Sequence, residues 1–341
     1  MPDVFAHFQA AYLDQLRRTY YASEYVNTPR GNPSRERLGV SFRIEDPVQR
    51  HVWLPSRRTN IIFNFAEALW YLSGSDRLDF IGYYAPSIAN YSKDGETLAG
   101  TAYGPRIFHH GGGATPTNQW DSVLATLRED YDSKRAVMQI FEGAELTVPG
   151  NIDVACTLAL QFMIRDDALH GVGFMRANDA FRGVVSDVFS FTFLLEMMAT
   201  QLGLPVGTYI HQVGSFHVYE SDATWGHRVL REAENVAGRT LAEAPPFPRM
   251  PAEDNWPHVR EVLRLEELLR TDTVRLDAVA LAGLDLPGYW RDVVALFEIQ
   301  RQLRHRTKVD AYVVAALPDL YYDLVITKWP QLRSEPDTDA A

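Results

Sequence analysis

The sequence predicts a mixed α/β or α+β fold in a single domain spanning residues 1–341. Apolar segments with helical spacing alternate along the chain with shorter segments that have the composition of β-strands. The chain has 341 residues, of which 46% are hydrophobic, so it can bury a sizeable core. The sequence contains no internal repeat and no low-complexity tract, which favours one domain over two independent ones.

The first half of the chain is predicted to consist of helices and loops. An amphipathic opening helix is indicated by apolar residues at steps of three and four: Phe5, Phe8, Tyr12, Leu13 and Leu16. Residues 28–37 are rich in Pro, Gly, Asn and Arg and predict a loop, either simply solvated or covering a site. Residues 60–72 predict a buried helix that ends at Gly74. Residues 91–108 predict a loop, and residues 121–130 a polar helix.

The second half is predicted to contain four strands and then mainly helices. The strands are expected at residues 136–141, 157–164, 169–175 and 209–219, with a turn at Asp166 and Asp167. A long apolar helix is expected at residues 188–202, ending at Gly203. Residues 220–330 are predicted to be mainly helical, with a Pro-rich break at 245–251, and a polar tail is expected from Arg333.

Charge and cysteine content limit the classes of partner and compartment. The formal net charge of -11 disfavours binding to polymeric nucleic acid or acidic membranes, although a few convergent arginines can still bind a small phosphorylated ligand. The single cysteine excludes an internal disulfide. Residues 1–21 lack an apolar block of signal-peptide length, and we read no later run as a membrane span. We therefore expect a cytoplasmic protein.

Cys156 and Glu67 are the first candidates for chemistry. Cys156 precedes one predicted strand, and the next strand ends in Arg176, so a hairpin between them would bring a guanidinium near the sulfur. The alternative is that Cys156 is a small buried hydrophobic residue. Glu67 lies in an apolar helix, where desolvation would raise its pKa, unless it is a partly exposed helix residue.

Several motifs, in their order and spacing, resemble the thymidylate synthase family over about residues 28–220. They are Ala66-Glu67-Ala68-Leu69-Trp70, Leu72-Ser-Gly74, Ala102-Tyr103-Gly104, Asp132-Ser133-Lys134-Arg135, Asp153-Val-Ala-Cys156, Gln161-Phe162, Arg176-Ala-Asn-Asp179, Gly183, Asp187 and His217-Val-Tyr219. Within the family, the sequence most resembles the cytidylate (CMP) 5-hydroxymethylases of nucleoside antibiotic biosynthesis. The resemblance implies a large mixed twisted sheet flanked by helices, with the sheets of a homodimer packed back to back.

The resemblance also implies roles for these residues. Cys156 would be the nucleophile that adds to C6 of a pyrimidine, Glu67 would relay protons, and Tyr103 would help remove the C5 proton. The other implied groups are the sugar ligands His217 and Tyr219, the substrate-binding Ala177 and Asn178, the phosphate ligands Arg30 and Arg176, and Lys134 and Arg135 from the twin subunit. Asp179 is assigned to both the catalytic and the folate-binding sets, the latter with Arg182 and Gly183. No metal is expected.

Asp187 is the most informative departure from the family. Thymidylate synthases have an asparagine at this position, whose amide reads N3–H and O4 of uracil. An aspartate takes the N4 amino donor of cytosine and, through a shared proton, its N3, so the change indicates a cytosine nucleotide. The alternative is that Asp187 caps the N-terminus of the helix that follows.

Two further departures concern the product and the sugar. Residues 88–94 lack the tryptophans that shield the methylene group in the family, which favours addition of water and a hydroxymethyl product. Lys134 and Ala177 replace an arginine and a serine, and the space released favours a ribose, hence CMP over dCMP.

The sequence therefore predicts transfer of a one-carbon unit from 5,10-methylenetetrahydrofolate to C5 of CMP, giving 5-hydroxymethyl-CMP and tetrahydrofolate. Hydroxymethylation of dCMP and methylation that produces dihydrofolate are the alternatives within the family. A nucleotide-binding regulator without catalysis is the alternative of another class.

Overall fold

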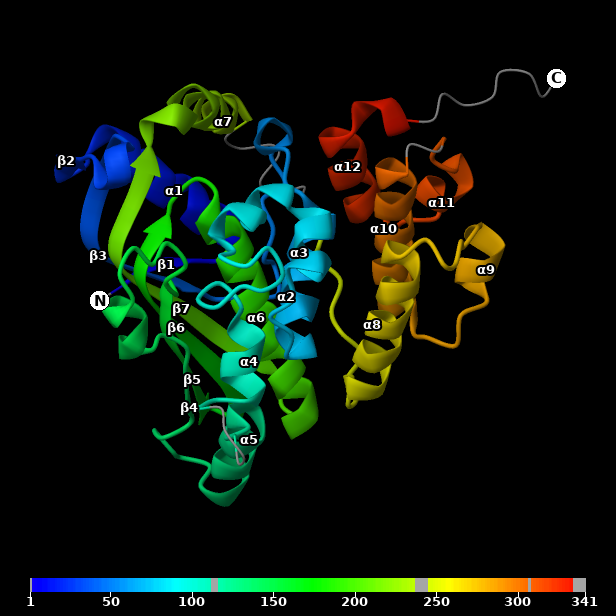
Figure 1. The fold of residues 1–341 in the computed structure, drawn as a ribbon, viewed down its shortest axis with the longest axis horizontal. Helices are drawn as coiled ribbons and strands as arrows, with labels where there is room; N and C mark the ends of the chain where they lie inside the picture. Colours follow the sequence, from blue (N-terminus) through cyan, green and yellow to red (C-terminus); the bar gives the residue numbers. More distant parts are fainter. Residues whose placement is uncertain (1, 112–115, 237–244, 306–307, 334–341) are drawn as a thin grey trace.

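A seven-stranded mixed sheet forms the centre of the computed structural model, which describes residues 2–111, 116–236, 245–305 and 308–333 (Figure 1). The strand order is β1-β3-β7-β6-β5-β4, and β2 pairs with β3. The strands are β1 (Asp3–Phe5), β2 (Tyr25–Asn27), β3 (Ser34–Ile44), β4 (Val137–Gln139), β5 (Thr157–Arg165), β6 (Ala168–Asp179) and β7 (Val206–Tyr219). The pairs β1–β3 and β6–β7 are parallel and the others are antiparallel, so the predicted mixed class is confirmed.

Helices surround the sheet and fill most of the remaining chain. They are α1 (Phe8–Tyr21), α2 (Ile61–Ser73), α3 (Leu78–Tyr84), α4 (Tyr103–Phe108), α5 (Gln119–Glu129), α6 (Gly183–Leu202), α7 (Ala223–Val236), α8 (Trp256–Arg270), α9 (Ala278–Ala282), α10 (Gly288–Arg304), α11 (Ala311–Ala315) and α12 (Asp319–Lys328). Helix α6 packs on β6 and β7, and α2 packs on α6. Short 3-10 segments include η1 (Pro29–Gly31) and η3 (Pro86–Tyr91).

The predicted helix α2 is confirmed together with both of its ends. The Asn60 side chain accepts a hydrogen bond from the backbone N–H of Phe63 at 3.2 Å, which satisfies a free donor of the first turn. Gly74 ends the helix at φ 70°, in the left-handed region that glycine adopts without strain. Both caps fix the position of the intervening Glu67.

Three local predictions were wrong at their boundaries. Residues 28–37 were predicted as a loop, but β3 begins at Ser34 and pairs with β7 along almost its whole length, a distant pairing that local composition does not reveal. Residues 91–108 were also predicted as a loop, but α4 covers the last six of them. Phe5 belongs to β1 and not to the opening helix.

Helix α6 begins five residues earlier than predicted. Its N-cap residue is Arg182, so Asp187 lies inside the helix, and the capping alternative for Asp187 is wrong. This helix is also long and apolar enough to cross a membrane, contrary to our expectation that no run approached a span. Because 78% of its most apolar window is buried inside the molecule, it has the character of a core helix.

The C-terminal helices α8 to α12 lie beside α2 and α3, on the side away from the sheet (Figure 1). Trp290 of α10 contacts Phe193 of α6 with ring centroids 6.2 Å apart, and Tyr321 of α12 contacts Phe65 of α2 at 5.7 Å. These side chains belong to the same hydrophobic cluster as the residues over the sheet. The expected polar tail from Arg333 lies, apart from Arg333 itself, outside the described residues.

Candidate active site

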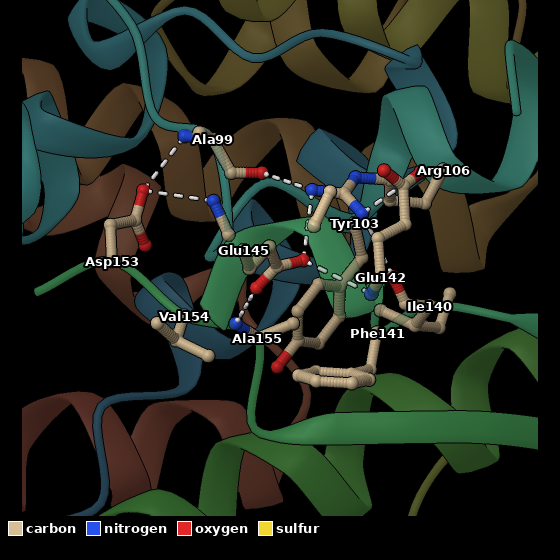
Figure 2. Close-up of polar contacts among 12 residues, drawn as sticks. Ala99, Tyr103, Arg106, Ile140, Phe141, Glu142, Glu145, Asp153, Val154 and Ala155 are labelled. Carbon is tan, nitrogen blue, oxygen red and sulfur yellow. Dashed lines mark hydrogen bonds and ion pairs between the residues drawn. The ribbon is translucent and has the colours of Figure 1, made fainter. Parts of the chain in front are cut away.

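A buried carboxylate fixes the segment that precedes Cys156. Asp153 accepts a hydrogen bond from the backbone N–H of Ala99 at 2.7 Å (Figure 2). It also accepts from the backbone N–H groups of Gly100 at 2.9 Å and Thr101 at 2.8 Å. Charged acceptors make the stronger hydrogen bonds, and all three donors belong to the turn that leads into α4. The Cys156 segment and the Tyr103 segment are therefore held together by one side chain.

A second carboxylate, Glu145, supports the same segment from the other side. Its Oε2 accepts from the backbone N–H of Ala155 at 2.7 Å, and its Oε1 lies 3.0 Å from a guanidinium nitrogen of Arg106 (Figure 2). Arg106 also pairs with Glu142 at 3.0 Å. Because Ala155 is directly before Cys156, this network limits the freedom of the thiol.

Arg176 lies beside the sulfur, as the predicted hairpin required. Strands β5 and β6 pair antiparallel, and Arg176 Nη2 lies 3.5 Å from Cys156 Sγ. The guanidinium is oriented by the carbonyls of Ala155 at 2.8 Å and Val154 at 2.9 Å, while the side chain stays exposed. An exposed, oriented guanidinium suits an anionic ligand next to the thiol.

Burial dominates the titration of the thiol in this structure. It raises the pKa of Cys156 above its ordinary value, while the positive charges of Arg176 and then Arg30 act in the opposite direction. A guanidinium near the sulfur, as the predicted hairpin required, stabilises a thiolate. Its effect has that sign but is smaller than the effect of burial, so the thiol is protonated at neutral pH.

Glu67 is a buried carboxyl group at the base of the site. Burial and then the charge of Asp187 raise its pKa to about 8, against a hydrogen bond from Ser190 Oγ at 3.1 Å that lowers it. The side chain is 8% exposed, so the alternative of a partly exposed helix residue is wrong. A group with this pKa can both release and accept a proton near neutral pH.

Tyr103 lies between α2 and the Cys156 segment. Its hydroxyl accepts from the backbone N–H of Thr157 at 3.4 Å, and its ring stacks on Tyr71 with centroids 4.8 Å apart. Burial and then the charge of Cys156 raise the pKa of Tyr103 well above its ordinary value. The hydroxyl is therefore a neutral hydrogen-bonding group in the neighbourhood of the sulfur.

Asp187 reaches the site from the first turns of α6. Its Oδ2 accepts a hydrogen bond from Asn178 Nδ2 at 2.7 Å. Burial raises the pKa of Asp187 to about 7, Asn178 lowers it, and the charge of Asp179 raises it. The carboxyl acts electrostatically on both Glu67 and Cys156, which places it in the same site.

The expected sugar and folate residues lie at the ends of β6 and β7. Asp179 pairs in register with His217, whose ring contacts Tyr219 at a centroid distance of 5.0 Å. Asp179 Oδ1 accepts from the backbone N–H groups of Phe181 at 2.8 Å and Arg182 at 3.0 Å. Burial raises the pKa of Asp179 against these bonds.

Arg182 and Gly183 have distinct surroundings. Arg182 pairs with the buried Asp222, with Nε 2.8 Å from the carboxylate, so part of its hydrogen-bonding capacity is already used. A Cβ on Gly183 would lie 3.1 Å from Asn178 Nδ2 and 3.5 Å from Asp187 Oδ2. The glycine therefore keeps the space beside these two side chains open.

The expected phosphate residues form two groups. Arg30 is exposed at φ 51° in η1, and its charge acts on Cys156 and Tyr219, so it belongs with Arg176. Ala177 follows Arg176 on β6 and pairs with Ser215. Lys134 and Arg135 are exposed before β4, and the Lys134 carbonyl accepts from Gln161 on β5 at 2.9 Å.

Sequence reasoning missed three buried polar residues around Asp187. Ser190 contacts Glu67, and Tyr209 and His211 of β7 continue the hydrogen bonds from Asn178. Alternation along the strand places His211 on an apolar face, where a histidine without a visible partner resembles a core residue. No signal within the strand indicates that its partner is Asn178.

Together these residues place a thiol, a carboxyl group with a pKa of about 8 and an exposed guanidinium in one part of the fold. In the described ranges there is no group of three or more His, Cys, Asp or Glu side chains that could hold a metal ion. The arrangement suits covalent addition of the sulfur to an anionic ligand and subsequent proton transfer.

Comparison with known proteins gives a consistent result. The family model described as thymidylate synthase matches residues 10–252. The deoxyuridylate hydroxymethyltransferase of Bacillus phage SP01 is 30% identical over 244 residues, 69% of this chain and 63% of the relative. The protein of the same description from Delftia phage PhiW-14 is 30% identical over 237 residues, 66% of this chain and 64% of the relative. The chain thus spans less than two thirds of the length of these relatives.

Proposed function

Because the chain belongs to the thymidylate synthase family, we propose that it hydroxymethylates C5 of a pyrimidine nucleotide and that this nucleotide is CMP. The one-carbon unit would come from 5,10-methylenetetrahydrofolate, and water would complete the reaction. The products would be 5-hydroxymethyl-CMP and tetrahydrofolate. We place the reaction in the cytoplasm, where a protein with a single unpaired cysteine is compatible with the reducing environment.

The position of Asp187 is the observation that carries the choice of base. The Asp187 carboxyl accepts a hydrogen bond from Asn178 and acts electrostatically on Cys156 and Glu67, so we place it where a pyrimidine bonded to the sulfur would present its 3- and 4-positions. An ionised carboxylate has no donor for O4 of uracil, whereas it accepts from N4–H of cytosine. With a pKa of about 7, the group also carries a proton in a large fraction of molecules at neutral pH, and this proton can be donated to N3.

The chain's own residues account for the steps at the pyrimidine. The Cys156 sulfur, after losing its proton, forms a bond to C6, and the electron pair of the C5–C6 double bond makes C5 nucleophilic. After the one-carbon unit is attached to C5, the C5 proton is removed with the help of Tyr103. Glu67 exchanges protons with the ring, and the sulfur leaves C6 when the hydroxymethyl product is complete.

The folate is expected to bind beside Asp179 and Gly183. Methylenetetrahydrofolate supplies a one-carbon unit at the oxidation level of formaldehyde. Asp179 Oδ1 is held by two backbone N–H groups, which leaves Oδ2 able to accept from an N–H donor of the ligand. The open space at Gly183 is compatible with a flat ring. Arg182, whose guanidinium is paired with Asp222, would line one side of the folate site.

The proposed preference for a hydroxymethyl product and for a ribose depends on positions where this chain has smaller side chains than thymidylate synthases have. Residues 88–94 contain no tryptophan, so no indole from this segment shields the methylene carbon from water. Ala177 lacks the hydroxyl of a serine and leaves space next to Arg176. Both features favour water addition and CMP over methylation and dCMP.

Hydroxymethylation of dUMP is the second candidate, because the relatives are described as deoxyuridylate hydroxymethyltransferases. This reaction would use the same nucleophile and the same folate as the reaction on CMP, and water would again add to the methylene carbon. It differs in the base that Asp187 would contact and in the sugar. The two candidates can therefore be separated by substrate competition alone.

The test is incubation with methylenetetrahydrofolate and an equimolar mixture of UMP, dUMP, CMP and dCMP, followed by mass analysis. We expect CMP to gain one CH₂O unit without absorbance from dihydrofolate, and Cys156→Ala to form no product. We expect Asp187→Asn to lower the CMP rate by at least about 100-fold and to turn over UMP or dUMP. A product from dUMP alone in the unmodified protein would reject CMP, and dihydrofolate formation would reject hydroxymethylation.

We also propose a homodimer in which Lys134 and Arg135 contribute to the partner's phosphate site. Both side chains are exposed, and the arginines that act on Cys156 within the chain are Arg176 and Arg30. Large apolar side chains are exposed on several strands, among them Leu38, Val137 and Leu158. Burying such side chains against a second sheet is a common reason for dimerisation.

A further inference from the structure

A line of hydrogen bonds, two of them buried, connects Asp187 with Asn178, His211 and Tyr209. Tyr209 Oη lies 2.9 Å from His211 Nδ1, and His211 Nε2 lies 2.9 Å from Asn178 Oδ1. Asn178 Nδ2 then donates to Asp187 Oδ2 at 2.7 Å. The groups come from β7, β6 and α6, so the line connects three elements of the core.

The line has a preferred direction of donation. Burial lowers the pKa of His211 to about 3, so its ring is neutral and carries one N–H. With the hydrogen on Nε2, Tyr209 donates to Nδ1, His211 donates to Asn178, and Asn178 donates to Asp187. In the opposite tautomer Nδ1 carries the hydrogen, so the Tyr209 hydroxyl would need another acceptor. Tyr209 is only 2% exposed, and a buried hydroxyl without an acceptor is costly.

The fold keeps the Tyr209 hydroxyl in this place. A Cβ on Gly173 of β6 would lie 2.2 Å from Tyr209 Oη, a distance that no side chain can accept. The absence of a side chain at Gly173 therefore makes the first hydrogen bond of the line possible. A bulkier residue would displace the hydroxyl from His211.

The direction of donation matters because a neutral carboxyl group can present two different hydrogen-bonding patterns to a base. With its hydrogen on one oxygen it matches cytosine, and with the hydrogen on the other oxygen it matches uracil. The Asn178 amide donates to Oδ2, so a hydrogen on the carboxyl belongs on Oδ1. A fixed hydrogen position removes the ambiguity and leaves one of the two base patterns.

We propose that Tyr209, His211 and Asn178 are positioning residues that fix the hydrogen-bonding pattern of Asp187 and thereby its choice of base. This inference rests on the proposed function, since it concerns the same contact between Asp187 and the pyrimidine. Tyr209 and His211 can act in this way without approaching the substrate, and only Asn178 needs to approach it.

Other groups around Asp187 also influence its charge and must be held constant in a test. The ionisable neighbours that interact with it electrostatically come from α2, α4, the Cys156 segment, β6 and β7: Glu67, Tyr71, Tyr103, Cys156, Asp179 and Tyr209. Substitutions at Asn178 and His211 leave all six in place. Tyr209→Phe removes one hydroxyl that stays neutral at working pH.

The kinetic test compares kcat/KM for CMP and UMP in the unmodified protein, Asn178→Leu and Tyr209→Phe between pH 6 and 9. We expect the CMP:UMP ratio to fall at least about tenfold in Asn178→Leu and about threefold in Tyr209→Phe. Loss of the Asn178 bond also raises the pKa of Asp187, so the alkaline decline of the CMP profile moves to higher pH. Tyr321→Phe is the matched control, because its hydroxyl is buried without a hydrogen-bond partner in the described part of the chain.

Equal losses for both nucleotides, with an unchanged pH profile, would overturn the inference and leave a structural role only. A separate measurement does not depend on turnover: ring-¹⁵N labelling of histidine should show His211 as a neutral Nε2–H tautomer at pH 7. A charged ring or an Nδ1–H tautomer would also overturn it. An unmodified protein that uses UMP in place of CMP would reject the proposed function, whereas the tautomer would still report on the direction of donation.

Discussion

Two carboxyl groups with raised pKa values, Glu67 and Asp187, face the same space from α2 and α6. Burial is the largest cause in both. The charge of Asp187 also raises the pKa of Glu67, and the charge of Asp179 also raises the pKa of Asp187. The two residues therefore supply protons near neutral pH that ordinary carboxylates would have lost. Such an arrangement lowers the stability of the folded protein at alkaline pH, and carboxyl groups with raised pKa values are typical of sites that transfer protons.

The replacement Glu67→Gln should stabilise the protein at alkaline pH. The carboxyl of Glu67 loses its proton near pH 4.5 in the unfolded chain and near pH 8 in the folded protein. Its contribution to stability is therefore complete below pH 4.5 and is lost as the pH rises towards 8. We expect the free energy of unfolding of Glu67→Gln to exceed that of the unmodified protein by about 1–3 kcal/mol at pH 8.5.

The measurement is urea unfolding followed by circular dichroism at pH 5 and pH 8.5. The difference should be much smaller at pH 5, where the unfolded chain is still partly protonated. Glu261→Gln serves as the control, because Arg264 holds the pKa of this carboxyl below its usual value, which gives the opposite pH trend. A pH-independent effect of Glu67→Gln would contradict a raised pKa.

At this scale the sequence indicated most of the residues that surround Cys156, because they occur in motifs of recognisable spacing. The cysteine–arginine contact and the buried state of Glu67 both agree with the prediction. Tyr209 and His211 were not predicted, since their role depends on Asn178, which comes from a different strand. Whether the assigned residues bind substrate as expected stays a prediction.

At the scale of elements, the contact of α2 with α4 places Tyr103 near the thiol. Gly104 makes this contact close: a Cβ there would lie 2.9 Å from Gly74 Cα and 2.9 Å from the Tyr71 carbonyl oxygen. Both neighbours are backbone atoms, which cannot move aside as a flexible side chain can. The two helices can therefore approach only with glycine at this position.

The replacement Gly104→Ala should lower kcat by about 10- to 100-fold, because it pushes Tyr103 away from the Cys156 segment. We expect a smaller effect on nucleotide affinity, since the phosphate and sugar residues lie on other elements. Steady-state kinetics and calorimetric binding of CMP provide the two quantities. Gly288→Ala is the control, because its Cβ would meet only a side-chain nitrogen at 3.9 Å. An unchanged kcat in Gly104→Ala would contradict a positional role for this contact.

The elements that the sequence predicted best are those with local signals. Helix α2 has a capping asparagine and a terminating glycine, and the β5–β6 turn has Asp166 and Asp167 at φ 50° and 55°. Strand β3 was not predicted at all, because its first half is rich in charged residues and its partner β7 is remote in sequence. The start of α6 was missed because Gly183 is a poor helix former that is held in place by tertiary contacts.

At the scale of the whole molecule, the catalytic side of the sheet and the C-terminal helices share one hydrophobic cluster. The family match ends at residue 252, before α8. Helices α8, α10 and α12 all contact α2, the helix that carries Glu67. The additional helices therefore support the active-site helix from behind.

The proposed dimer predicts that two inactive subunits can restore one active site. We expect Cys156→Ala and Arg135→Ala to be inactive or strongly impaired when each is alone. After unfolding and refolding of an equal mixture, half of the dimers should be mixed, and one of their two sites should be intact. Activity should therefore recover to about a quarter of the unmodified level. The control is a mixture of Cys156→Ala with Arg176→Ala. If Arg176 acts within its own subunit, the mixed dimer of this pair has no intact site.

In a mixed dimer of Cys156→Ala and Arg176→Ala, each site carries one of the two substitutions, so activity should stay near the sum of the single variants. Recovery in this control, or none in the Arg135 mixture, would contradict the proposed assignment of arginines to subunits. Sedimentation of the unmodified protein as a monomer would contradict the dimer itself.

The pairing of β3 with β7 also has a consequence for how the protein forms on the ribosome. Ser34 pairs with Tyr219, so the strand that follows Arg30 lacks its neighbour until most of the chain has been synthesised. Parallel pairing of β6 with β7 is likewise delayed until the crossover helix α6 is complete. Until then the β5–β6 hairpin beside the thiol has an unpaired edge and α6 lacks its contacts with β7, so we expect this interval to be the time of greatest exposure to oxidation and aggregation.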